Sequence, residues 1–183
     1  IGKQDGSFKE SEFFRPQGLH HENGIIWVAD TENHLIRHIN LKTEIVSTIA
    51  GTGIQGVPLQ GQLIATSAAL SSPWDVQLVG DQLYFANAGT HQIGVVDLKQ
   101  KIVSRFAGTG QEALVNGLRT EGAFAQPSGL SYGEDKLFLA DSETSSIRSV
   151  RIDKAGFIAT YVGKGLFDFG DKDGRGKEAL LQH

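Results

Sequence analysis

The sequence predicts an all-β protein built from about three copies of one four-stranded unit. One pattern, a strand followed by a tight polar turn and a second strand, occurs three times, at 27–37, 83–93 and 137–148. The aligned residues Ala29, Ala86 and Ala140 recur at a spacing of roughly 55 residues, and a period of this length indicates a repeat architecture. Glycine, at 23 of 183 residues, is well above its usual share of about 7%, which indicates many turns.

Each copy has the same order of elements. A proline (Pro16, Pro73 or Pro127) comes first, as expected where a strand begins, because proline has no N–H to donate within a sheet. A short strand, the repeated pattern and a fourth strand follow, and the copy ends in a pair of glycines. Four short antiparallel strands per roughly 55 residues are typical of a β-propeller blade. The predicted units cover about 14–53, 70–110 and 124–165.

The ends of the chain predict a partial propeller over residues 1–183. Asp5-Gly6 precedes Pro16 by the same spacing at which Asn116-Gly117 precedes Pro127. Counted from Asp173-Gly174, that spacing ends just beyond His183, so 166–183 is predicted to lead into a fourth unit. Propellers close with about four to eight blades, and three blades cannot close a ring. The remaining blades are expected from further chain or from self-association with a second copy.

Composition argues against several classes of function. The net charge of −4 gives no electrostatic reason to expect nucleic acid or an anionic membrane as the main partner. No apolar run approaches the roughly 18 residues of a membrane span. Without cysteine the chain does no thiol chemistry and forms no disulfide, so its composition does not indicate whether it works in an oxidising or a reducing compartment. A soluble protein is expected, with the cytoplasm slightly favoured.

Two pairs of oppositely charged residues are predicted to be structural. Asp30 and Arg37 flank the turn of the first unit, and Asp141 and Arg148 flank that of the third. The second unit lacks both charges, since Asn87 and Gly94 stand there instead. Residues that appear and disappear together are expected to be partners, and an Arg–carboxylate contact would fix the turn. A functional carboxylate is the alternative.

No metal site, cofactor site or catalytic group is predicted. His34 and His91 hold equivalent turn positions and could face a common opening, but the histidines lack metal-ligand spacing. A turn histidine more often bonds to the backbone. Gly51, Gly53 and Gly56 match a dinucleotide-binding pattern, but no helix follows to hold a pyrophosphate.

The repeat resembles an NHL repeat. The residues that carry the resemblance are Val28–Arg37, preceded by Pro16–Leu19 and followed by Thr48–Gly53. Ser72–Val76, Ala88–Ile93 and Phe124–Leu130 are more narrowly similar to the family of NHL-repeat-containing protein 2. That resemblance implies a six-bladed propeller, of which this chain would be about half, and a thioredoxin-like domain elsewhere in the longer protein.

The favoured function is a non-catalytic scaffold for protein–protein or interdomain interaction. In propellers of this kind the loop before each first strand and the turn between the second and third strands share one face. That face would present six candidate partner-binding residues: Arg15, His34, Trp74, Asp75, His91 and Gln126. Exposed Trp and Arg are frequent anchors for a protein partner. Packing of Trp74 against a neighbouring blade is an equally good interpretation.

Two other functions remain open. Propeller lyases and lactonases bind metals with residues of the innermost strands, where this chain offers His20, His21, Gln77 and Ser131, an inconsistent ligand set. Some NHL propellers bind RNA through a basic face, and the acidic total charge argues against this without excluding a local patch.

Overall fold

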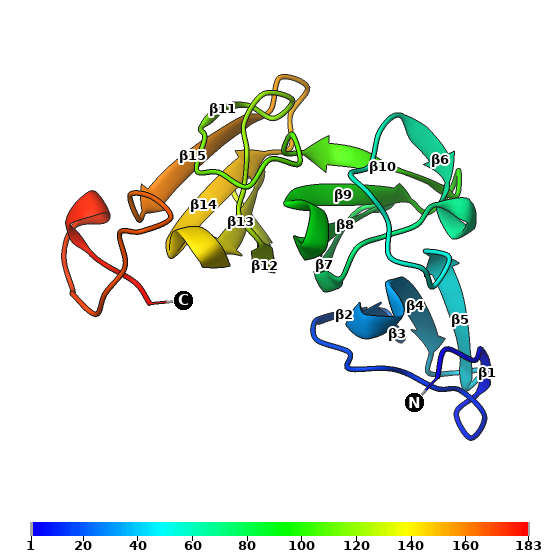
Figure 1. The fold of residues 1–183 in the computed structure, drawn as a ribbon. Helices are drawn as coiled ribbons and strands as arrows, with labels where there is room; N and C mark the ends of the chain where they lie inside the picture. The colour runs from blue at the N-terminus through cyan, green and yellow to red at the C-terminus, as the bar shows by residue number, and fades with distance from the viewer. Residues whose placement is uncertain (1, 183) are drawn as a thin grey trace.

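The computed structural model describes residues 2–182, which form three antiparallel five-stranded sheets, the blades of a β-propeller (Figure 1). The first blade contains β1 (Gly6–Ser7), β2 (Leu19–Glu22), β3 (Ile25–Asp30), β4 (Leu35–Asn40) and β5 (Ile45–Ala50). The second contains β6 (Gln62–Ile64), β7 (Pro73–Val79), β8 (Gln82–Asn87), β9 (Gln92–Asp97) and β10 (Ile102–Ala107). The third contains β11 (Gly117–Leu118), β12 (Pro127–Gly133), β13 (Lys136–Asp141), β14 (Ser146–Arg151) and β15 (Phe157–Val162).

Short 3-10 helices lie in several of the segments between and after the strands. They are η1 (Thr31–Asn33), η2 (Ala65–Ser67), η3 (Ala88–Thr90), η4 (Ser142–Thr144) and η5 (Gly176–Glu178). Three of them join the second and third long strands of a blade, and each ends in a left-handed residue: His34, His91 and Ser145. The sharp reversal brings the two strands into an unbroken antiparallel register. None of the described helices is long and apolar enough to span a membrane.

A fifth strand adds to the four that the sequence predicts for each blade. β1, β6 and β11 come from the segment that precedes the blade, and they pair with its outermost strand, β5, β10 or β15. Each is only two or three residues long, and two of them begin with glycine, so they carry no strand pattern in the sequence. We call these preceding segments lead-ins.

The core lies between neighbouring blades. The first and second blades pack through a cluster that includes Trp27, Ile36, Leu83 and Phe85. The second and third pack through another that includes Tyr84, Ile93, Leu137 and Ile158. Alternate residues of β8 therefore face opposite neighbours, as the period of a β-strand requires. Both faces of the second blade are buried, which explains its short continuous apolar strands.

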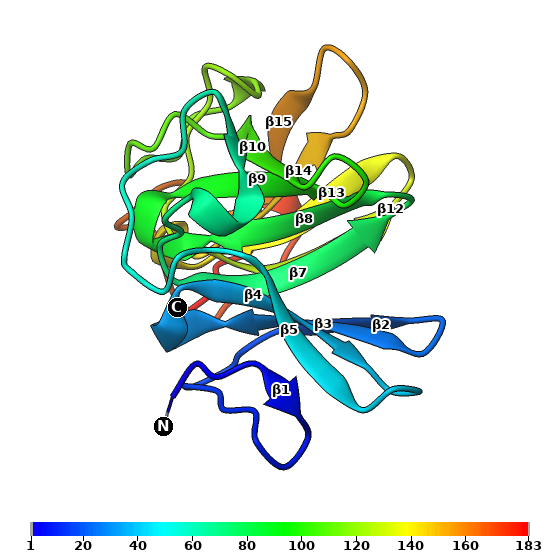
Figure 2. The ribbon, with the colours of Figure 1, turned by 90° about the vertical axis from the view of Figure 1, so that its right-hand side faces the viewer.

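The three blades form an open fan, with β2, β7 and β12 innermost (Figures 1 and 2). One face of the first blade is left uncovered by the other blades, and Phe8, Phe13, Ile26, Ile39 and Val46 line a shallow cavity of about 310 Å³ there. The aligned residues of the second blade, such as Leu83 for Ile26, are buried against a neighbour. The first blade therefore lacks, on this face, the kind of neighbour that buries the equivalent residues of the second blade.

A buried arginine fastens the lead-in to the first blade. Arg37 forms an ion pair with Asp30 (Nη1 to Oδ2, 2.9 Å), and both side chains are completely buried. The same guanidinium donates to the backbone carbonyls of Gln4 and Glu12, both at 2.9 Å, and to the carboxylate of Asp5 at 2.7 Å. The pair that flanks the turn therefore also holds a segment that lies well before it in the chain.

The third blade repeats this arrangement. Arg148 pairs with buried Asp141 at 2.9 Å and donates to the carbonyls of Ala123 (2.6 Å) and Val115 (2.8 Å) and to Oδ1 of Asn116 (3.2 Å). Burial raises the pKa of Asp141 and lowers the pKa of Arg148, because desolvation of the two charges outweighs their attraction. Through these contacts Arg148 holds residues 115–123 against its own blade.

The second blade fastens its lead-in without charge. The ring of Phe85 covers the backbone of Gly94, where any Cβ would collide with it. The side-chain amide of Gln92 accepts a hydrogen bond from Leu59 N (2.8 Å) and donates to Leu59 O (3.4 Å). The second unit lacks both Asp and Arg, and the uncharged side chain of Gln92 holds its lead-in instead.

Candidate functional site

The beginnings of the three innermost strands meet at the centre of the fan and form what we call the axial mouth. Its residues are equivalent in the three units: Gln17 and Gly18, Trp74 and Asp75, Ser128 and Gly129. They line an open cavity of about 410 Å³. Because all three blades contribute the same positions, the mouth is a product of the repeat.

Asp75 ties the inner strands of the mouth together. Its Oδ1 accepts a hydrogen bond from Val76 N (2.8 Å), and its Oδ2 accepts one from Leu130 N of the third blade (2.7 Å). On the other side Gly18 of the first blade packs so closely that a Cβ there would collide with the carboxylate. Burial raises the pKa of Asp75, while the two amide donors and His20 oppose that rise. The carboxylate thus links the second and third blades by a hydrogen bond and lies against the backbone of the first.

Trp74 offers the mouth an aromatic surface. Its side chain is partly exposed, and it lines the cavity beside Asp75. The indole N–H has no hydrogen-bond partner among residues 2–182. Since it is not a buried atom, it is open to solvent. A solvent-accessible donor on a large apolar ring, held in a strand, is a feature of binding surfaces.

His34 and His91 lie at the junctions between blades. Nδ1 of His34 accepts a hydrogen bond from Ser72 N (3.0 Å), and Nδ1 of His91 accepts one from Gln126 N (3.1 Å). Each bond joins the turn of one blade to the residue before the first strand of the next. Since Nδ1 is the acceptor, the proton of each neutral ring is assigned to Nε2.

The junction at His34 is expected to weaken in acid. Burial lowers the pKa of His34, and the charge of Glu32 only partly opposes this. A base with a lowered folded-state pKa stabilises the fold above its unfolded value of about 6.5 and loses that contribution as the pH falls through the folded value. We therefore expect His34 to make the melting temperature lower at pH 5 than at pH 7.5.

The matched variant is His34→Asn, since asparagine tolerates the left-handed backbone and keeps a side-chain acceptor. It should show a smaller pH-dependent loss of melting temperature than the natural chain. His38, whose pKa is also lowered by burial, is present in both proteins and cancels in the comparison. Equal pH dependence of the two chains would show that His34 does not titrate as expected.

The six predicted partner-binding residues do not form one site. Trp74 and Asp75 line the axial mouth. His34 accepts from the second blade, and His91 and Gln126 join the second blade to the third. Arg15 is exposed at the position equivalent to Gln126, with its guanidinium 5.8 Å from the ring centroid of Phe14. The mouth residues that sequence reasoning missed, Gln17, Gly18, Ser128 and Gly129, align with Trp74 and Asp75 and could have been found from that alignment.

The innermost strands carry the other residues considered. Nδ1 of His20 lies 3.3 Å from Nε2 of Gln77, and His21 and Ser131 are exposed. Among residues 2–182 no group of three or more His, Asp or Glu side chains is placed to hold a metal ion.

No protein-family model matches the chain. The chain is 45% identical over its whole length to NHL repeat-containing protein 2 of Homo sapiens and 43% identical to that of Gallus gallus, and it covers 29% of each. The chain is built of NHL repeats. It is also 44% identical over its whole length to SUPPRESSOR OF QUENCHING 1, chloroplastic, of Arabidopsis thaliana, covering 18% of that protein. The NHL chain therefore spans less than a third of these relatives.

Solved structures support the propeller fold of the NHL repeats. An auxiliary nutrient binding protein from Bacteroides ovatus superposes with a TM-score of 0.67 at 16% identity, covering 93% of this chain and 42% of that one. A streptogramin B lyase superposes with a TM-score of 0.51 at 12% identity, covering 80% and 40%. At such low identities the likeness concerns the fold alone.

Proposed function

We propose that this NHL segment is a non-catalytic binding scaffold that contacts another protein, or another domain of the same longer protein, through the axial mouth. The observation that carries the proposal is Trp74, whose accessible indole lines a cavity formed by equivalent positions of three repeats. Buried aromatic anchors with a polar handle dominate the affinity of many protein interfaces.

The mouth is preorganised for such an anchor. Asp75 uses both carboxylate oxygens on backbone amides of two blades, so the strand that bears Trp74 is held in place before any partner arrives. Fixing a contact surface in advance lowers the entropy lost on binding. Ser128 and two glycines line the same cavity as Trp74 with small groups, which leaves room for a partner's side chain.

The partner that we favour is a thioredoxin-like domain of the same longer protein. This preference rests on the resemblance of the repeats to NHL-repeat-containing protein 2, and relatives several times the length of this chain have room for further domains. A separate protein partner is the alternative.

The test is an NMR titration of the chain with a separately produced thioredoxin-like domain of the kind that the resemblance implies for the longer protein. The two tryptophans give two indole N–H signals, one from Trp27 in the core and one from Trp74 at the mouth. We expect the Trp74 signal to shift and the Trp27 signal to stay. Trp74→Ala should weaken binding by about 10-fold or more, the loss typical of a hot-spot residue.

Phe167→Ala is the matched control, because Phe167 is a large aromatic residue that is 89% exposed and lies outside the mouth. It should leave the affinity within about two-fold. Binding that leaves the Trp74 signal unmoved, or equal losses for both variants, would refute the axial mouth as the contact surface. If this domain does not bind at all, the interdomain form of the proposal is wrong.

A further inference from the structure

The lead-ins of the first and third blades share one local structure with the end of the chain. Glu12 N donates to Gln4 O (3.1 Å) in the first lead-in, and Val115 and Ala123 exchange both backbone hydrogen bonds (3.1 and 3.3 Å) in the lead-in of the third blade. Lys172 and Leu180 exchange the same pair of bonds at 2.9 and 3.2 Å, around a turn that η5 supplies. We call residues 170–182 the C-terminal lead-in.

The lead-ins of the first and third blades each receive a guanidinium. Arg148 binds the carbonyl oxygens of the bridged residues Val115 and Ala123 and the side chain of Asn116. Arg37 does the same with Gln4, Glu12 and Asp5. A threonine of the outermost strand completes each arrangement, through Thr160 with Asn116 (2.8 Å) and Thr48 with Asp5 (3.0 Å).

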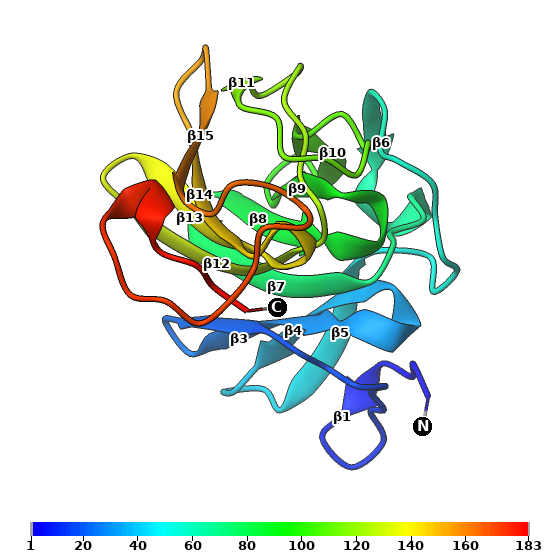
Figure 3. The ribbon, with the colours of Figure 1, turned by 60° about the vertical axis from the view of Figure 1, so that its left-hand side comes forward.

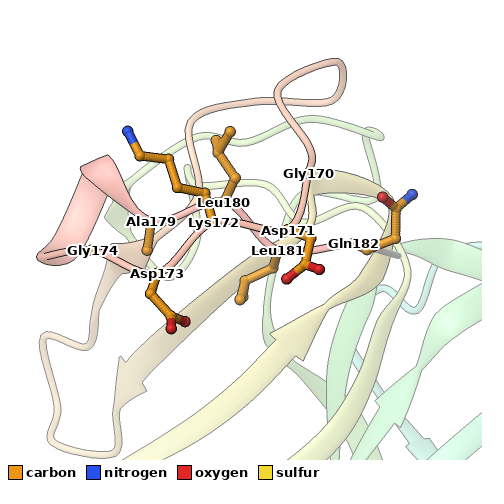
Figure 4. Close-up of a pocket in the computed structure, with 9 residues that line it drawn as sticks. All are labelled: Gly170, Asp171, Lys172, Asp173, Gly174, Ala179, Leu180, Leu181 and Gln182. Carbon is orange, nitrogen blue, oxygen red and sulfur yellow. The ribbon is translucent and has the colours of Figure 1, made fainter.

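The C-terminal lead-in presents the same groups around a cavity. Three residues of this segment line a cavity of about 470 Å³: Lys172, Asp173 and Leu180 (Figure 4). By alignment they correspond to Val115, Asn116 and Ala123. Asp173 is exposed, and the segment lies beyond β14 and β15, on the side of the third blade away from the second (Figures 1 and 3).

We propose that the C-terminal lead-in is a preformed receptor for the arginine of a further NHL repeat of the same polypeptide. The carboxylate of Asp173 and the carbonyl oxygens of Lys172 and Leu180 would accept from its guanidinium, and Asp173 would also accept from a threonine of that repeat's outermost strand. A carboxylate and two carbonyls match the fork of donors that an arginine presents.

A second copy of this chain cannot supply that arginine. Arg37 and Arg148 are each completely buried and bound to their own lead-ins, and the second blade has Gly94 at the equivalent position. If the first blade of another copy sat beside the third blade, its arginine would already be engaged by residues 4–12. The receptor therefore selects for a new repeat and against closure of the ring by a second copy.

The experiment supplies such a repeat as a probe. A copy of residues 127–162 is joined directly after residue 183, which reproduces the spacing that separates Asn116 from Pro127. Asp173→Ala should then lower the melting temperature of the extended chain by about 3–8 °C, as expected for a lost charge-assisted hydrogen-bond set. Without the appended repeat the same substitution should change it by less than about 1 °C, because Asp173 is exposed there.

Asp171→Ala is the matched control, since Asp171 is an exposed carboxylate close by that does not align with Asn116. It should have no more than about a 1 °C effect in either chain. Replacing the appended copy of Arg148 by Met should abolish the dependence on Asp173. Equal effects of the two aspartates, or an appended repeat that stays unfolded by hydrogen exchange, would overturn the proposal. A dimer of the original chain that Asp173→Ala dissociates in sedimentation would overturn it as well.

Discussion

Replacing Asp141 by Ala is expected to lower the free energy of unfolding by about 3–5 kcal/mol. The substitution leaves the guanidinium of Arg148 completely buried with no compensating charge. It also removes the acceptor for Ala125 N, which bonds Oδ1 of Asp141 at 2.7 Å. Urea unfolding followed by circular dichroism measures the loss, and Asp168→Ala, at an exposed carboxylate, should stay within about 0.5 kcal/mol of the natural chain.

The second blade supplies a sharper comparison. Leu139→Phe, Asp141→Asn and Arg148→Gly together install the residues that stand at the equivalent positions there. The triple variant should be less destabilised than Asp141→Ala alone, because it removes both charges and because asparagine can still accept from Ala125, as Asn87 accepts from Ser71 at 2.9 Å. A triple variant less stable than the single one would show that the lead-in contacts of Arg148 outweigh the burial of its charge.

Phe85→Ala is expected to cost a similar amount, about 3–5 kcal/mol, since the ring is completely buried between the first and second blades. The space it leaves adjoins the backbone of Gly94, which has no side chain to fill it. Phe85→Leu retains much of the volume and should cost markedly less. Both losses are measured by the same urea titration.

A double-mutant cycle tests whether the ring and the glycine form one unit. In the natural chain Gly94→Ala places a Cβ against the ring of Phe85 and should destabilise it. In the Phe85→Ala background that collision is gone, so Gly94→Ala should cost less or stabilise. Strictly additive effects would contradict the packing of ring on backbone.

Much of the fold could be predicted from the sequence because three aligned copies identify a strand even where one copy alone would not. Three aligned copies of a strand, turn and strand define the four long strands of each blade even where one copy is atypical. The short strands β1, β6 and β11 could not be predicted, since two or three residues, two of the runs beginning with glycine, carry no alternation. Their place in the sheet is decided by pairing with β5, β10 and β15, which come much later in the chain.

The site was less predictable than the fold. The correlated presence of Asp30 with Arg37 and of Asp141 with Arg148 pointed to contacts, and the structure brings both pairs together. That each arginine also binds its lead-in could not be predicted, because backbone carbonyls have no sequence signature. The sequence favours a backbone hydrogen bond for a turn histidine, and His34 makes one, but that the amide belongs to the neighbouring blade could not be predicted.

The fastening of each lead-in by its own blade redefines where one module of this protein begins. Val115 and Ala123 belong mechanically to the blade of Arg148, although both precede Pro127. A duplication, deletion or circular permutation with its breakpoint at the prolines would separate each lead-in from the blade that binds it. A breakpoint just after the paired glycines would keep each lead-in with its own blade. Gene-level rearrangements of these repeats, natural or engineered, should therefore survive at the second boundary and fail at the first.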